Sequence, residues 1–281
     1  MMRRTQSGFT LVEMIMVMVI TGIIGGMVAV FLKAPIDQYM DVARRSDMTD
    51  IADTALRRIE RDIRLALPNS VRVNTSGSGA NTVYYLDFLS TTGGGRYRTA
   101  AAPSGTSAGC GSLAADVLDL TAADTCFEVL GTTPTCAAND QVVMYNLGIS
   151  GADVYTGDNR TTCNSAVAPI INIAAKKFPF ASPNARFQVV HEQVRYICNP
   201  GAHTLTRYSL GTAIAPPSPA VPGVSGALLA GNVSSCNFSY DPLPLAQRFG
   251  LVTMNLGITE ASGANSETVT LYSATHVSNV P

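Results

Sequence analysis

One acidic residue, Glu13, lies inside an otherwise apolar run near the start of the chain. Residues 9–32 contain no other acidic or basic side chain. A lone carboxylate at that depth in a membrane is costly unless it is paired, so an acid in this position indicates a functional role. The alternative interpretation is a carboxylate that extends to the lipid headgroups and does nothing further.

The apolar run itself is long enough to cross a bilayer as one helix. About 24 residues, at a rise of about 1.5 Å each, cover the roughly 30 Å hydrocarbon core. Arg3 and Arg4 precede the run, so the positive-inside rule places the short N-terminus in the cytoplasm. Gly22 and Gly26 form a Gly-x-x-x-Gly pair that predicts close helix packing; alternatively, glycine is simply common in membrane helices.

The start of the run carries a motif, Ser7-Gly8-Phe9-Thr10-Leu11-Val12-Glu13-Met14. This motif resembles the class III leader of type IV prepilins and type II secretion pseudopilins. The resemblance implies that residues 1–8 are a leader, that a prepilin peptidase cuts between Gly8 and Phe9, and that Phe9 becomes N-methylated. It also implies that Glu13 acts in filament assembly. An ordinary secretory signal loses its apolar region on cleavage, whereas this run follows the cut and is retained.

The new N-terminus and the acid suggest a pairing between subunits. Cleavage leaves an ammonium group on Phe9, and methylation preserves its charge. In a filament, Glu13 of one subunit can neutralise Phe9 of a neighbour in surroundings where either charge alone is costly. The partners that the resemblance implies are the prepilin peptidase, other minor and major pilins, and the inner-membrane assembly platform.

A second, amphipathic helix segment is expected over residues 33–67. Pro35 is expected to kink the helix or to start a new one, and Pro68 to end it. Asp53 and Arg57, like Glu60 and Arg64, have the i,i+4 spacing of helical ion pairs. The apolar stripe comprises Met48, Ile51, Ala52, Ala55, Leu56, Ile59, Ile63, Ala66 and Leu67.

The arginine-rich run over residues 56–66, followed by Ser70-Val71-Arg72-Val73, also resembles a known helix. Similar segments occur in J-type minor pseudopilins, PilW-like minor pilins and MshO-type minor pilins of mannose-sensitive haemagglutinin (MSHA) pilus systems. We interpret the arginines as a solvated helix face. The alternative is that they contact acidic groups of neighbouring subunits.

Residues 68–281 are predicted to form a β-rich head. Residues 74–81 and 91–111 have turn and loop compositions, and insertions are expected around 93–140 and 150–185. The predicted fold is α+β and pilin-like: a long kinked helix packed on a mostly antiparallel sheet, with large loop insertions. Strands are predicted over residues 83–89, 141–147, 187–198, 204–208, 235–240, 251–258 and 268–277.

All six cysteines follow the apolar run. An even number on the translocated side of a membrane indicates disulfides in an oxidising compartment, most simply a bacterial periplasm. Their spacing does not suggest zinc, and we expect no metal and no cofactor. Pairing of sequence neighbours is the predicted arrangement: Cys110–Cys126, Cys136–Cys163 and Cys198–Cys236.

Patterns typical of other functions are weak in this chain. A formal net charge of −1 with 14% charged residues argues against nucleic-acid binding. Residues 105–109 match G-x-S-x-G, but the required strand and helix are not expected around Ser107. His191 is interpreted as a half-buried sheet residue. Asp153, Asp158 and Asn159 lack the spacing of an EF-hand. We therefore expect that the protein is not an enzyme.

The sequence supports a minor pilin or pseudopilin, a single-pass protein of the inner membrane with a periplasmic head. It would prime or cap a type IV pilus-like filament of the MSHA type. Two alternatives stay open: a J-type minor pseudopilin of a type II secretion system, and a tip adhesin that binds a surface ligand.

Overall fold

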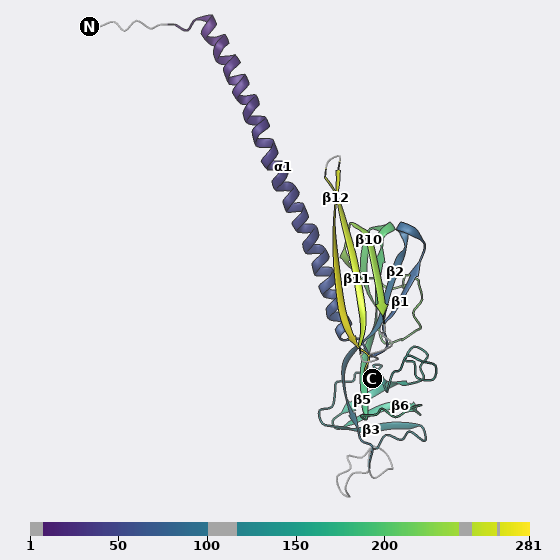
Figure 1. Cartoon of the computed structure of the whole chain (residues 1–281). Helices are drawn as coiled ribbons and strands as arrows, with labels where there is room; N and C mark the ends of the chain where they lie inside the picture. The colour runs from purple at the N-terminus through teal and green to yellow at the C-terminus, as the bar shows by residue number, and fades with distance from the viewer. Residues whose placement is uncertain (1–7, 101–116, 242–248, 263–264) are drawn as a thin grey trace, which may run out of the picture.

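The computed structural model of the chain describes residues 8–100, 117–241, 249–262 and 265–281. It consists of one long helix whose C-terminal half packs on a head of antiparallel strands (Figure 1). The head has two lobes stacked along its length, and the helix reaches only the first. The predicted α+β architecture is confirmed.

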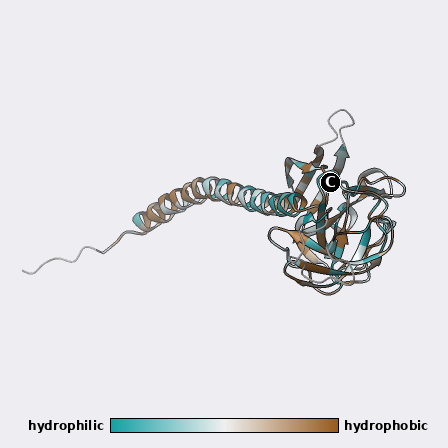
Figure 2. Ribbon diagram, turned by 90° about the horizontal axis from the view of Figure 1, so that it is seen from below, coloured by the Kyte–Doolittle hydropathy of each residue, from teal (hydrophilic) through white to brown (hydrophobic). Residues whose placement is uncertain are grey.

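Helix α1 (Leu11–Arg64) has 54 residues and is continuous. Pro35 lies inside it and does not end it, because one missing N–H removes a single bond from a ladder that continues on both sides. Figure 2 shows that the helix is curved. Its first half stands clear of the head, and its second half buries the stripe that includes Met48, Ile59 and Ile63. Ile51, predicted in that stripe, is 41% exposed instead.

The lobe next to α1, here called the helix-bound lobe, contains two sheets. Strands β10 (Val233–Asp241), β11 (Phe249–Ser262) and β12 (Asn265–Ser278) form one, and α1 packs mainly on β11 and β12. The other combines β1 (Arg72–Ser76), β8 (Thr204–Ser209) and β9 (Ala227–Ala230) with parts of the long strands β2 (Val83–Tyr97) and β7 (Arg186–Asn199). Side chains of α1 and of both sheets share one core.

Two short 3₁₀ turns complete this lobe. The first, Gly79–Asn81, connects β1 and β2, and the second, Pro200–Ala202, connects β7 and β8. The second confirms the hairpin expected between these strands, in which the Asn199 side chain accepts a hydrogen bond from the backbone N–H of Ala202 at 3.0 Å.

The second lobe, here called the distal barrel, is closed. Strand β3 (Asp124–Leu130) pairs with β2 and β6 (Ile170–Lys176), and β5 (Arg160–Val167) pairs with β6 and β4 (Gln141–Val143). Strand β4 then pairs with β7, and β7 pairs with β2, so the ring of strands is β2-β3-β6-β5-β4-β7. The segments expected as loop insertions therefore contain strands of a barrel. They were not predicted as strands because their apolar and polar residues do not alternate regularly and so give little periodic signal.

Strand β2 runs from one lobe into the other, and glycines mark the transition. Its register against β7 shifts between Ser90 and Thr91 and again between Thr91 and Gly93. A Cβ added at Gly94 would lie 2.7 Å from the backbone oxygen of Phe187 on β7. The expected loop over 91–111 is thus wrong as far as Tyr97: glycine permits a bulged strand whose backbone lies close to its neighbour.

Candidate functional site

The N-terminal end of α1 is closed by Thr10. Its backbone is extended, with φ −85° and ψ 152°, and its side-chain oxygen accepts a hydrogen bond from the N–H of Glu13 at 3.3 Å. Glu13 therefore occupies the third position of the helix, where a carboxylate also interacts favourably with the positive end of the helix dipole. Gly8 and Phe9 precede this cap outside the helix and are exposed, so the predicted cleavage point is not buried against the described part of the chain.

Glu13 is exposed among apolar neighbours. Phe9 is 81% exposed and Leu11 75% exposed. Among the residues that the structure describes, Glu13 has no ion-pair partner. A carboxylate that enters an apolar environment needs such a partner or access to the lipid headgroups, so the pairing of Glu13 with a neighbouring subunit stays a prediction.

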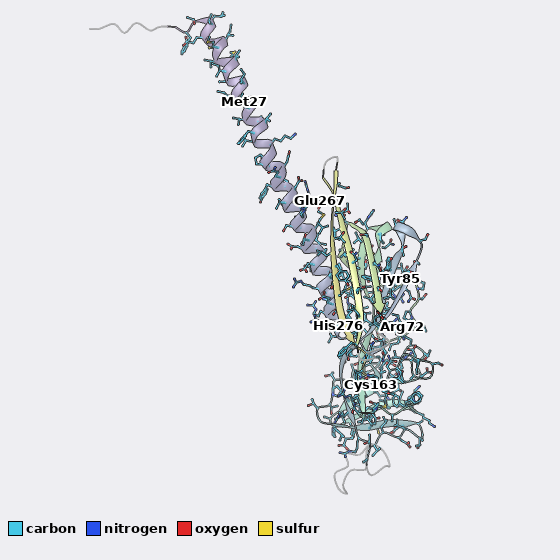
Figure 3. The ribbon with its side chains drawn as sticks, in the orientation of Figure 1. Met27, Arg72, Tyr85, Cys163, Glu267 and His276 are labelled. Atoms are coloured by element: carbon cyan, nitrogen blue, oxygen red, sulfur yellow. A yellow bond between two sulfur atoms is a disulfide. The ribbon has the colours of Figure 1, made fainter. Side chains whose placement is uncertain are left out.

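The N-terminal half of α1 is apolar and uncovered. It is the one helix of the described chain that is long and apolar enough to cross a membrane, and side chains such as Met27 project freely from it (Figure 3). An added Cβ at Gly22 or Gly26 would have nothing within 4 Å. The small-residue patch is therefore unoccupied within the described chain, and its packing role stays a prediction.

A polar cluster attaches the C-terminal end of α1 to the head. Asp62 accepts hydrogen bonds from the Tyr196 hydroxyl at 2.7 Å and from Arg207 Nε at 2.8 Å. Arg207 also donates to Glu192 at 2.7 Å, and Arg58 lies 3.2 Å from Asp62 on the helix itself. The cluster fixes the rotation of the helix over β7 and β8. The helical pattern contains Asp62, but only the tertiary structure reveals its partners.

These contacts shift the protonation equilibria of the cluster. Burial raises the pKa of Asp62, but the hydrogen bonds from Tyr196 and Arg207 outweigh it, and the net pKa lies below the usual value. Burial and the Asp62 carboxylate together raise the pKa of Tyr196. Burial opposes the charge of Arg207, yet its hydrogen bonds to Asp62 and Glu192 raise its pKa overall. The cluster is thus held with Asp62 ionised and Tyr196 protonated.

A buried ion pair lies between β2 and β7. Arg195 Nε donates to Asp87 Oδ1 at 2.7 Å, and the Asp87 side chain is fully buried. Burial raises the pKa of Asp87 more than Arg195 lowers it. Arg195 also donates to the backbone oxygen of Ala220 at 2.9 Å. The pair therefore anchors the segment around Ala220 to the sheet.

The i,i+4 pairs predicted on α1 are partly present. Arg57 Nε lies 2.6 Å from Asp53 Oδ2. Glu60 instead accepts a hydrogen bond from the Ser273 hydroxyl on β12, because the helix face that carries it is turned towards the sheet. Arg64 therefore lacks its predicted partner.

Two predicted disulfides are confirmed, one in each lobe. Cys198–Cys236 joins β7 to β10 and so links the two sheets beneath α1. Cys136–Cys163 joins the segment before β4 to β5 in the distal barrel, where Figure 3 labels Cys163. Cys126 is disulfide-bonded, and its predicted partner Cys110 lies outside the described residues.

The positions considered for other chemistry fall into separate places. His191 is exposed rather than half-buried, and its Nδ1 lies 2.8 Å from Asp140 Oδ1. Asp153 lies 3.6 Å from Arg72, and Asp158 accepts a bond from Thr156 at 2.5 Å. Asn159 is buried beside Asn146, its Nδ2 donating to Asn146 Oδ1 at 3.2 Å. Residues 105–109 lie outside the described residues. Within the described part of the chain, acidic, histidine and cysteine side chains do not gather into a metal site.

Residues 3–29 match the family described as the prokaryotic N-terminal methylation motif. The match covers the predicted cleavage point, Glu13 and most of the apolar run. The chain carries a type IV pilin-like class III leader. This supports a subunit of the pilin or pseudopilin type, with its apolar helix as a single-pass anchor. Searches against curated proteins and against solved structures found no match.

Proposed function

We propose that this chain is a minor pilin or pseudopilin, a non-enzymatic subunit that primes or caps a type IV pilus-like filament of the MSHA type. The observation that carries the proposal is the leader motif joined directly to an uncovered apolar helix. That helix is continuous with the one that holds the head. Such a chain can be stored in a membrane and later withdrawn from it without refolding its head.

In this proposal, different residues in α1 and just before it have different roles. Before assembly, the apolar half holds the subunit in the inner membrane with its head in the periplasm. Cleavage between Gly8 and Phe9 exposes an ammonium group one residue before the Thr10 cap. Glu13 of an incoming subunit then pairs with the Phe9 ammonium of a neighbour and sets the axial register. The Gly22 and Gly26 patch lets a neighbouring helix approach closely.

The distal barrel supports a second role at a filament tip. It lies at the end of the head away from the membrane half of α1 (Figure 1), and its core contains no described residue of α1. A tip subunit would expose this lobe, and binding of a surface ligand there is the adhesin alternative. A J-type subunit of a type II secretion system is the other alternative, and genes beside this one for pilus or secretion parts would separate the two.

The test is the substitution Glu13→Val in the full chain, expressed with its prepilin peptidase and assembly machinery. We expect normal processing, because the cleavage point is unchanged, and loss of the subunit from sheared filaments. Mass spectrometry of the N-terminus reports removal of residues 1–8 and methylation of Phe9. Immunoblotting of the sheared fraction reports incorporation.

The matched control is Met14→Val, the next position on the same exposed helix. It changes side-chain shape without removing a charge and should leave both processing and incorporation intact. Normal incorporation of the Glu13→Val variant would contradict the register role. An uncleaved wild-type chain would contradict the leader assignment itself.

A further inference from the structure

The solvent-facing side of the second half of α1 carries unpaired charges in two blocks. Asp47 and Asp50 lie towards the membrane half, and Arg61 and Arg64 lie in the last turns. All four are exposed, on the side away from the buried stripe. None of the four has an ion-pair or hydrogen-bond partner among the residues that the structure describes.

Between the two blocks the exposed face of the helix carries no unpaired charge, because Glu60 is turned towards β12 and bound by Ser273. Asp53 and Arg57, which lie there, neutralise each other in the ion pair already described. Arg58 is likewise paired, with Asp62. Along this face the unpaired charge is therefore two negative groups, then none, then two positive groups.

The two blocks have the same geometry. The members of each are three residues apart, and each arginine follows its aspartate counterpart by 14 residues (61 − 47 and 64 − 50). Fourteen residues are just under four helical turns, or about 21 Å along the axis. A parallel helix that turns this same side towards the first and is displaced by that distance therefore places its acidic block beside the basic block of an identical helix.

We propose that this face of α1 is a contact surface for a second copy of the chain displaced by about 21 Å along the helix axis. The inference rests on the proposed function, because it takes the chain to be a filament subunit, and it requires at least two copies of the chain at the primed or capped end. Copies inserted in one membrane have the same direction, so their α1 helices are parallel. The outer copy then presents Asp47 and Asp50 to Arg61 and Arg64 of the inner copy.

The same face disfavours contact between copies at equal depth in the membrane. In that arrangement aspartates meet aspartates and arginines meet arginines, and like charges at close range repel. Contact becomes favourable only after one copy has moved outwards. The charge pattern therefore acts against lateral pairing in the membrane and in favour of stepwise withdrawal.

Two simpler roles do not account for the pattern. Arg61 and Arg64 in the last turns favour the negative end of the helix dipole, but that effect says nothing about Asp47 and Asp50. The pairing of Glu13 with a neighbouring Phe9 implies a smaller axial offset. A helical assembly gives each subunit neighbours at several offsets, so the two contacts belong to different neighbours.

The test is disulfide cross-linking between full-length copies in filaments. Met40 and Thr54 are both exposed and are also 14 residues apart, so a copy carrying Met40→Cys should cross-link to one carrying Thr54→Cys. Two Thr54→Cys copies mark equal depth and should not cross-link. The described native cysteines are all disulfide-bonded, so they do not compete. Non-reducing gels of the sheared fraction measure the product.

Charge variants decide whether electrostatics holds the contact. Reversal of the basic block (R61E with R64E) should lower the 40–54 cross-link several-fold, and so should reversal of the acidic block (D47R with D50R). Both reversals together rebuild the complementary pattern with opposite polarity and should restore the cross-link. Asp53→Asn with Arg57→Gln is the matched control, because that pair is already neutral.

Incorporation of the chain without the 40–54 cross-link would overturn this contact alone. So would a cross-link that is unchanged when one block is reversed, or a dominant product from two Thr54→Cys copies. Absence of the wild-type chain from filaments would overturn the proposed function and this contact with it.

Discussion

The helix-bound lobe and the distal barrel solve the problem of burying a sheet in different ways. The helix-bound lobe has open sheets, which end at β1, β9, β10 and β12, and it completes its core with the apolar stripe of α1. The barrel closes six paired strands on themselves and buries its own interior. Closure removes exposed strand edges, whereas an open sheet needs a covering element. The lobe attached to α1 is thus tied to the helix, and the barrel is not.

The two lobes meet at a small third core with polar contacts around it. Leu67, in the segment that follows α1, packs there with Leu89 of β2 and Val190 of β7. The Tyr155 hydroxyl donates to the Ser70 backbone oxygen at 2.7 Å, and Asn146 Nδ2 donates to the Pro68 oxygen at 2.7 Å. These bonds hold the barrel against the segment that follows the helix.

Truncation of a core side chain should have the largest effect on stability and should show most clearly whether the two lobes unfold independently. Ile59→Ala removes a fully buried side chain from the α1 core and should cost about 2–5 kcal/mol of stability. Phe127→Ala does the same in the barrel, at about 3–5 kcal/mol. Hydrogen exchange should rise in α1, β11 and β12 for the first variant, and in β3 and β6 for the second. Faster exchange across both lobes in either variant would show that they are one cooperative unit.

A substitution at the transition between the lobes should have a smaller effect. Gly94→Ala places a methyl group 2.7 Å from the Phe187 oxygen and should lower stability by about 1–3 kcal/mol, because β2 and β7 must separate locally. Gly231→Ala is the control, since nothing lies within 4 Å of its added Cβ. Urea unfolding of both variants measures the difference. Equal free energies of unfolding for the two variants would mean that β2 and β7 can separate locally without loss of stability.

An effect of similar size, which depends on pH, concerns the docking of α1. The lowered pKa of Asp62 means that its ionised form stabilises the fold above its unfolded pKa of about 3.9, and that this contribution is lost as the pH falls through the folded value. Asp62→Asn should cost on the order of 1–3 kcal/mol at pH 7. The difference from the wild-type chain should shrink at pH 3.

The control for this comparison is Asp53→Asn, which breaks an exposed pair and should change stability little at either pH. Unfolding curves at the two pH values measure both variants. A deficit of Asp62→Asn that is the same at pH 3 and pH 7 would exclude ionisation of Asp62 as the source.

Local patterns in the sequence were sufficient for the helix and for most of the helix-bound lobe. The stripe from Met48 to Ala66 matches the buried face, apart from Ile51, because helical periodicity is repeated over many turns. The strands expected near residues 187–198, 251–258 and 268–277 are present. They could be predicted because their apolar and polar residues alternate or because the strands are long. Two of the disulfides predicted between neighbouring cysteines are also present.

The barrel could not be predicted from local sequence patterns in the same way. Strands β5 and β6 are short and mix apolar with polar residues, and β4 has only three residues. Their burial depends on the pairing of β2 with β7, whose paired residues in the barrel, such as Arg96 and Arg186, are far apart in the sequence. No local sequence pattern indicates that these strands close into a ring. The partners of Asp62 were missed for the same reason, because Tyr196 and Arg207 approach it only when α1 docks.

The sequence by itself determined the N-terminal features of this chain: the leader motif, the apolar helix and the lone acid Glu13. These features are contiguous, and their chemistry depends on composition and order. The tertiary structure decided what that helix carries and which of its charges stay unpaired. Asp47, Asp50, Arg61 and Arg64 have the same residue types as the paired Asp53, Arg57 and Asp62. Spacing within the helix pairs Asp53 with Arg57. Packing supplies Tyr196 and Arg207 to Asp62 and draws Glu60 to Ser273, which leaves Arg64 without its expected partner.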